Sequence, residues 1–186
     1  MLDKALRKIE LYIISLWLLF LLVAIKEFQF VHGNFSLHAD AIWNFVQPNL
    51  ISLSSLVLLL IGGLCYWHFL YLLKGSSDLP KTIKKIDDQN FEHLTFLTTY
   101  IVPFLRVKLE GRDLIMTVML LIIIGAIFVR TNLFYKNPTL ALLGYRLYKV
   151  DTAESAGAIF ISKQPLQTGD TVHNIYLAEN IYFVKK

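Results

Sequence analysis

The sequence contains one cysteine, Cys65, among 186 residues. A single cysteine excludes an intramolecular disulfide, and it also excludes a metal site that needs several cysteine ligands. The sequence has no GxxxxGK[ST], GxGxxG, HExxH or GxSxG pattern, and its five histidines are scattered over separate regions. These patterns carry phosphate binding and common hydrolytic chemistry. We therefore expect no enzymatic activity, no cofactor and no metal site.

Charged residues are scarce in three long stretches, at residues 9–25, 50–73 and 114–129. A fourth apolar stretch, at 94–105, is shorter and more polar. Hydrophobic residues make up 55% of the chain, whereas a soluble domain contains about 45–50% apolar residues. A bilayer core of about 30 Å is crossed by roughly 17–25 apolar helical residues. The pattern predicts membrane spans at about 9–26, 50–73, 92–109 and 114–130.

The predicted fold class is a membrane all-α bundle of four transmembrane helices with a small C-terminal cytoplasmic β-rich module. The first domain covers residues 1–130, and the β-rich tail module covers 131–186. The basic start of the chain and the apolar run after it are also typical of a secretory signal. However, the run is long, and Lys26 and Glu27 follow it where small residues would mark a cleavage site. This pattern favours a retained first span.

Small and hydroxylated residues within the second and third predicted spans are candidates for helix packing. Gly62 and Gly63 permit close approach of a neighbouring helix, and Thr95 and Thr99 make one side of the third segment polar. Pro103 interrupts that segment and leaves a carbonyl that a hydroxyl or another helix has to satisfy. A pore lined by the small and polar residues of the spans is the alternative interpretation.

The loop after the first span contains a short amphipathic helix at 37–46. Ser36 is suited to cap its start, and Pro48 stops it. Such a helix beside a span lies in the membrane interface, with a tryptophan at headgroup depth. The residues expected to form this external interfacial helix are Leu37, Ile42, Trp43 and Phe45.

The sequence changes character after Arg130. One helical turn at 139–143, closed by Gly144, is followed by four stretches with period-two hydrophobicity at 145–150, 158–161, 172–176 and 181–184. A β module this small does not bury all its aromatic residues, and tyrosine is favoured at interfaces. The candidates for docking a partner are Tyr145, Arg146, Tyr148, Lys149, Tyr176, Tyr182 and Phe183.

Basic residues predict the orientation, since positively charged loops stay in the cytoplasm. Three Lys or Arg residues precede the first span, four lie between the second and third, and seven follow Arg130 inclusive. The first loop has one basic residue. The turn before the last span has three basic residues, Arg106, Lys108 and Arg112. This turn disagrees with the rule, because four spans place it outside the cytoplasm. The count predicts a multi-pass inner-membrane protein with N- and C-termini in the cytoplasm. It also explains the positive charge without direct nucleic-acid binding.

Two segments resemble the membrane subunit of the Kiwa bacterial anti-phage system. They are residues 98–105 (TTYIVPFL) and residues 137–150 (NPTLALLGYRLYKV). The size, the spans and the C-terminal module fit this resemblance along essentially the whole chain. The resemblance implies a homo-oligomer, a tetramer, that acts with a cytosolic DNA-binding subunit encoded in the same operon. It transfers no individual functional residue.

Three function hypotheses follow from the sequence. The leading hypothesis is a non-enzymatic membrane sensor and scaffold that recruits its partner to the inner membrane on phage infection. The alternative is a small oligomeric ion channel that depolarises the cell. An assembly factor for another membrane complex is a third, weaker reading. Ion flux in liposomes separates the first two, because a scaffold passes no current.

Overall fold

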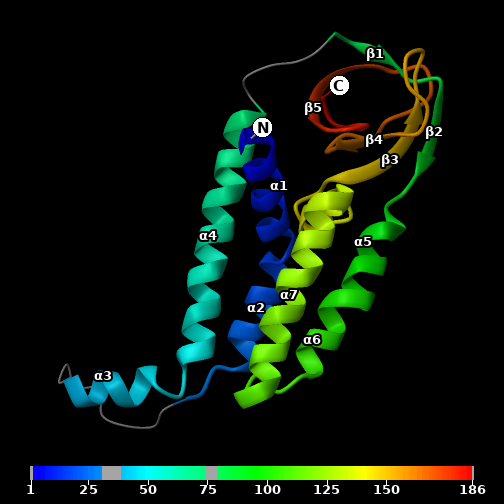
Figure 1. Ribbon diagram of the computed structural model, residues 1–186. Coiled ribbons are helices and arrows are strands. Elements are labelled where there is room, and N and C mark those ends of the chain that lie inside the picture. The colour runs from blue at the N-terminus through cyan, green and yellow to red at the C-terminus, as the bar shows by residue number, and fades with distance from the viewer. Residues whose placement is uncertain (1, 31–38, 74–78, 186) are drawn as a thin grey trace.

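The protein is described by a computed structural model that covers residues 2–30, 39–73 and 79–185. Helices run roughly side by side at one end of the molecule, and a curled sheet occupies the other end (Figure 1). The chain begins with α1 (Leu2–Ser15) and α2 (Trp17–Lys26), which are bent by 40° at Leu16. Helix α3 (Ala39–Val46) precedes the long helix α4 (Leu50–Leu72).

The chain then enters the sheet before it returns to the helices. Strands β1 (Lys81–Thr82) and β2 (Lys85–Asp88) are followed by α5 (Phe91–Phe96), a π-helix at Leu97–Ile101 labelled η1, and α6 (Val102–Arg106). Helix α7 (Gly111–Thr131) runs back to the sheet and ends at Asn132, which adopts a left-handed conformation. The short helices η2 (Leu133–Tyr135) and α8 (Pro138–Leu142) connect it to the remaining strands.

The last four strands are β3 (Arg146–Asp151), β4 (Ala158–Ser162), β5 (Thr171–Ala178) and β6 (Ile181–Lys185). The six strands are ordered β1-β5-β6-β4-β3-β2, and all neighbours are antiparallel except β4 and β6. The tight connection between β5 and β6 places Asn180 at φ 57, a conformation that asparagine tolerates in hairpin turns.

Consecutive strands β1 and β2 lie at opposite edges of the sheet, and only two residues separate them. Both of these residues form backbone hydrogen bonds, one just before the start of β5 and the other at the end of β3. The Ile83 N–H donates to the Asp170 carbonyl at 2.9 Å, and the Lys84 N–H donates to the Asp151 carbonyl at 2.8 Å. The segment therefore brings the two edges toward each other and makes the sheet curl (Figure 1).

The curl gives the sheet two differently packed faces. One core, on the inner side, contains Phe160, Val150 and Val172, all fully buried, together with Ile83 from the edge segment. The other core joins the sheet to the helices through Leu147, Ile161 and Phe183. Alternate residues of β3, β4 and β6 point to opposite faces, which is why one strand contributes to both cores.

The fold class predicted from the sequence is wrong. Within the described residues, two helices, α4 and α7, are long and apolar enough to cross a membrane, or three if the bent pair α1–α2 counts as one. The segment predicted as a span at 92–109 is instead broken into α5, η1 and α6. The β structure is not a separate C-terminal module either, because residues 81–88 supply both edge strands.

Candidate interaction sites

Helices α4 and α7 expose apolar side chains over most of their surface. Only 17% of the most apolar stretch of α4 and 11% of that of α7 are buried inside the structure. Exposed leucine, isoleucine and valine side chains occur along both helices, and soluble proteins rarely leave apolar patches of this extent uncovered. This surface is suited to contact with lipid or with another apolar protein surface.

The α2–α4 contact contains Gly62, a predicted helix-packing residue. A Cβ atom added at Gly62 would lie 3.1 Å from Cδ1 of Trp17, whereas one added at Gly63 would meet nothing within 4 Å. The Trp17 indole N–H donates to the Leu59 carbonyl at 2.9 Å. Gly62 therefore allows the Trp17 ring to lie against α4, and this contact is within one chain.

Gly125 was missed by the sequence analysis, and it permits the closest helix contact. A Cβ at Gly125 would lie 2.6 Å from Cε1 of Tyr12, so the ring of Tyr12 occupies the space that a side chain would need. The Tyr12 hydroxyl donates to the Leu121 carbonyl one turn earlier at 2.6 Å. Together, the glycine and the tyrosine fix α1 against α7.

The other helix-packing candidates, Thr95, Thr99 and Pro103, lie on the exposed side of the segment from α5 to α6. Both threonine hydroxyls donate within their own helix, Thr95 to the Phe91 carbonyl and Thr99 to the Thr95 carbonyl. The π-helix ends at Ile101, two residues before Pro103, and the Val102 N–H donates to the Leu97 carbonyl. Because proline lacks an N–H, the helix cannot continue regular hydrogen bonding at this position.

The sheet is joined to the end of α4 by aromatic and polar contacts. Phe183 of β6 packs edge-on against Phe69 of α4, with ring centroids 6.1 Å apart. The Lys185 ammonium donates to the Leu73 carbonyl at the end of α4, at 3.0 Å. A cation at this position is favoured by the partial negative charge of a helix C-terminus.

Tyr145 also belongs to this junction. Its hydroxyl lies 3.4 Å from that of Tyr66, and its ring packs against Phe183. Burial raises the pKa of Tyr145 well above its ordinary value, and the hydrogen bond with Tyr66 adds to the increase. Tyr145 is therefore a neutral component of the helix–sheet junction.

A second junction joins α5 to the segment before α8. Lys136 forms an ion pair with Glu92 at 2.8 Å. Burial lowers the pKa of Lys136, but the hydrogen bond with Glu92 and the electrostatic effects of Tyr135, Glu92 and Tyr100 together outweigh burial, so the pKa is raised. Beside this pair, the His93 ring is 3% exposed and is therefore shielded from water. The N-terminal end of α5 is held by this ion pair and by the Asn90 side chain, whose Oδ1 accepts the Leu147 N–H at 2.9 Å.

The structure does not bring the seven predicted docking residues onto one surface. Tyr145, Tyr148 and Phe183 are buried in the two cores. Arg146 and Lys149 are exposed, but they lie three positions apart on β3 and so point to opposite faces. Tyr176 and Tyr182 form a ring contact at 6.0 Å, and Tyr176 is 40% exposed.

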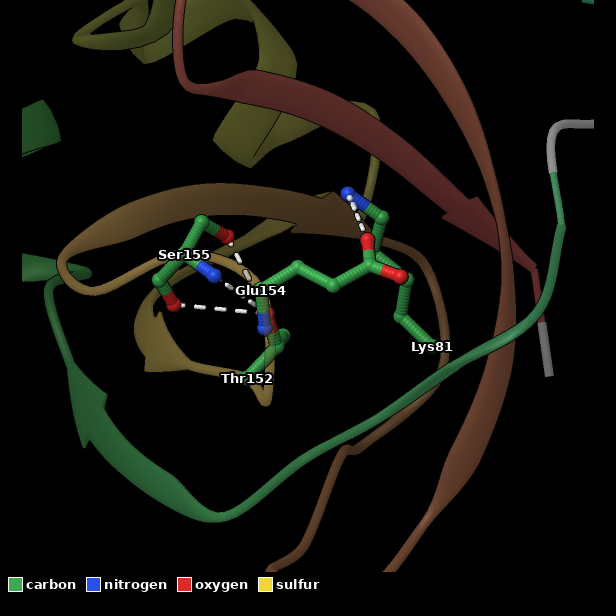
Figure 2. A network of polar contacts seen from close by, with 4 residues as sticks. All are labelled: Lys81, Thr152, Glu154 and Ser155. Atoms are coloured by element: carbon green, nitrogen blue, oxygen red, sulfur yellow. Dashed lines mark hydrogen bonds and ion pairs between the residues drawn. The ribbon is translucent and has the colours of Figure 1, made fainter.

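Lys81 extends this aromatic pair into a cluster that sequence analysis did not detect. Its ammonium lies 4.5 Å from the centre of the Tyr182 ring and 3.4 Å from a Glu154 carboxylate oxygen. Figure 2 shows Lys81 reaching from β1 across to the β3–β4 turn. Thr152 stabilises that turn, since its hydroxyl oxygen accepts the Glu154 and Ser155 N–H groups. We name Lys81, Glu154, Tyr176 and Tyr182 the sheet-edge cluster.

Helix α3 confirms that the first loop contains a short helix. Trp43 is 65% exposed, Ile42 is also exposed, and Phe45 packs against Phe28 with ring centroids 6.4 Å apart. Leu37, the fourth predicted interfacial residue, lies outside the described residues. The helix is at the end of the molecule opposite the sheet and runs across the direction of α4 (Figure 1).

Together, these features define a helical protein whose apolar surface is compatible with a membrane and whose curled sheet lies at one end. Among the residues that the structure describes, no three metal-ligating side chains gather in one place. No solved structure matches the chain.

The family model "Anti-phage protein KwaA" matches residues 7–183. The chain is 30% identical over 189 residues to the Kiwa protein KwaA of Escherichia coli O55:H7 (strain RM12579 / EPEC), covering 96% of this chain and 95% of that relative. The chain therefore belongs to the KwaA family of anti-phage defence proteins, as the sequence resemblance predicted.

Proposed function

We propose that this anti-phage protein is a non-enzymatic membrane sensor and scaffold of a Kiwa defence complex. In this proposal, the apolar helices lie in the bacterial inner membrane, and the sheet recruits a cytosolic DNA-binding subunit when phage infects. The protein acts as a homo-oligomer, a tetramer. Family membership supports the defence role. The exposed apolar surface of α4 and α7 is the observation that carries the membrane role.

The proposed orientation places the N-terminus and the sheet in the cytoplasm. Figure 1 shows both at the same end of the helices, while α3 and the turn between α6 and α7 lie at the opposite end. Lys84 and Lys85 are two of the four basic residues between the second and third predicted spans, and they lie in the sheet region. The arrangement supports the orientation because basic segments remain preferentially in the cytoplasm.

The sheet-edge cluster is the best candidate for contact with the cytosolic subunit. It combines exposed tyrosine surface with a lysine and a glutamate on adjacent elements. Tyrosine contributes large, rigid contact area at interfaces, and β1 is a short edge strand beside it. Tyr145, Tyr148 and Phe183 are not expected to touch the partner, because they are buried in the two cores.

Co-purification from cells that express the native operon tests recruitment. Tyr176→Ala should reduce the yield of the cytosolic subunit by about tenfold, as expected for the loss of one central aromatic contact. Leu142→Ala is a matched control, because Leu142 is also exposed but lies on α8. Equal loss with both variants, or no loss with Tyr176→Ala, would move the docking surface away from the sheet-edge cluster.

Alkaline-phosphatase fusions test the orientation separately. A fusion after residue 35 should be active, and a fusion after residue 129 should be inactive, because the enzyme requires the oxidising periplasm. An active fusion at residue 129 would contradict the proposed orientation. Ion flux from liposomes that contain the purified protein would instead favour the channel alternative.

A further inference from the structure

A large groove lies between the η1–α6 segment and α7. Its volume is about 1040 Å³, and its walls are mainly apolar. One wall carries Tyr100 and Phe104, and the other carries Met119, Leu120 and Ile123. The volume is at the upper limit of the roughly 300–1000 Å³ that small-molecule sites occupy. Its size and its apolar walls suit a ligand with long hydrocarbon chains.

The irregular backbone of η1 and α6 forms one side of this groove. Thr99 and Pro103, which the sequence analysis assigned to helix packing, both line it. The Thr99 hydroxyl donates to the Thr95 carbonyl within the segment, and the Pro103 side chain has no polar group, so both side chains present mainly carbon to the groove. Local π-turns are frequently found at functional sites, and this one faces the groove through Thr99 and Tyr100.

Charged residues line the groove at the place where α6 ends and α7 begins. Arg106 and Lys108 lie on one side, and Asp113 lies on the other. Among the described residues, neither Arg106 nor Lys108 has an ion-pair partner, and both are exposed. The groove therefore has a net positive end beside a long apolar wall. A guanidinium and an ammonium together are suited to a phosphate group.

We propose that this groove binds a phospholipid with an anionic headgroup, with the acyl chains along α7 and the phosphate at Arg106 and Lys108. The inference rests on the proposed membrane location of α7. It also accounts for the discordant basic turn in the orientation count, because a bound anionic headgroup compensates these two charges on the far side of the membrane.

A second copy of the chain fits the groove less well. In a two-fold dimer with the grooves facing each other, both copies present the same Arg106 and Lys108 to the contact. Each copy also presents Asp113, but one carboxylate does not balance two basic residues, and the remaining like charges of the two copies repel each other. A phospholipid supplies the negative charge and the apolar chains in one molecule.

Lipid retention by the purified full-length protein tests the proposal. The protein is reconstituted into vesicles of phosphatidylcholine and phosphatidylglycerol in a 3:1 ratio, extracted with mild detergent, and examined by native mass spectrometry. We expect retained phosphatidylglycerol in preference to phosphatidylcholine. The double variant Arg106→Gln/Lys108→Gln should weaken retention of phosphatidylglycerol by roughly tenfold or more, since each basic residue near an anionic headgroup contributes separately.

Two further variants separate charge from space. Ile123→Trp should fill the groove and lower retention of both lipids, whereas Ile122→Trp, on an exposed position outside the groove lining, should not. Lys84→Gln/Lys85→Gln removes the same charge at the sheet end and should leave retention unchanged. Equal retention in the Arg106→Gln/Lys108→Gln variant and this control would overturn the proposal.

The remaining outcomes identify the occupant. A change in oligomeric state with Ile123→Trp, without a change in lipid retention, would overturn the proposal in favour of a second copy. Equal retention of both lipids by the wild-type protein would overturn the headgroup preference. Absence of the protein from the membrane fraction would contradict the proposed function itself. A protein that is inserted in the membrane but retains no lipid would contradict only this inference.

Discussion

The helical region and the sheet differ in where their apolar surface lies. Phe160, Val150 and Val172 are fully buried inside the curled sheet, so this region excludes water by its own packing. Ile122 and Leu60, on α7 and α4, are 65% and 69% exposed. The sheet therefore buries its large apolar side chains inside the chain, whereas the long helices leave many of theirs exposed on the described surface.

Removing a core side chain from the sheet should show this difference most strongly. Phe160→Ala should lower the free energy of unfolding by about 3–5 kcal/mol, because it removes a fully buried ring and leaves a cavity. Ile122→Ala removes an exposed side chain and should change stability by no more than about 0.5 kcal/mol. Thermal unfolding of the detergent-purified protein measures both. Similar losses for the two variants would contradict the comparison.

The link between β1 and β2 tests whether the sheet depends on a segment from between the helices. Ile83 is 1% exposed and belongs to the inner core of the sheet. Ile83→Ala should cost about 2–5 kcal/mol and increase protease cleavage within residues 81–88. Leu79→Ala, four residues earlier and almost fully exposed, is the control. An unchanged cleavage pattern in Ile83→Ala would show that the edge segment is dispensable.

Close packing within the helical region is tested at Gly125. Gly125→Leu should destabilise the α1–α7 contact by about 1–3 kcal/mol, because its Cβ alone would overlap the Tyr12 ring. Gly63→Leu places the same side chain where a Cβ meets nothing within 4 Å, and it should be tolerated. The melting temperature in detergent distinguishes them. If Gly63→Leu were the more damaging variant, packing between separate chains would dominate.

The smallest effect is expected at the sheet-edge ion pair. Glu154→Gln removes the charge that faces Lys81, but the Glu154 side chain is 73% exposed, so solvent weakens the attraction. The loss of stability should not exceed about 1 kcal/mol. High salt should produce a similar loss in the wild-type protein and almost none in Glu154→Gln. A loss of several kcal/mol would mean that the pair stabilises the curl of the sheet.

Local patterns were sufficient to predict several elements. The period-two stretches at 145–150, 158–161, 172–176 and 181–184 correspond to β3 to β6, and the turn predicted at 139–143 is α8. Long apolar runs also located α4 and α7. In each case, the side-chain pattern and the turn residues lie within one short segment, so the signal is local.

The edge strands could not be predicted in the same way. Residues 81–88 contain three lysines and two aspartates, and they resemble a polar linker. Ile83 is buried only because its backbone binds Asp170 and its neighbour binds Asp151, both far away in the sequence. Strand formation here depends on tertiary pairing rather than on local propensity.

The same limit applies to the candidate sites. Gly62 and Gly63 are identical neighbours in the sequence, yet only Gly62 faces Trp17. The sequence also contains no signal that pairs Lys81 with Glu154 across the sheet, or Gly125 with Tyr12. A deletion from Gly144 onward, which the predicted tail module suggests as a test of docking, would also remove the strand partners of β1 and β2.

The central claim is that the sheet faces the cytoplasm while the turn between α6 and α7 faces the outside. Labelling of single cysteines in a Cys65→Ser background tests it directly. Arg112→Cys, in the first turn of α7, and Thr168→Cys, between β4 and β5, place thiols at exposed positions. The start of α7 and the sheet lie at opposite ends of the molecule (Figure 1). A membrane-impermeant maleimide added to cells with a permeabilised outer membrane should label Arg112→Cys, and it should label Thr168→Cys only after the inner membrane is lysed. Labelling of Thr168→Cys before lysis would contradict the proposed orientation.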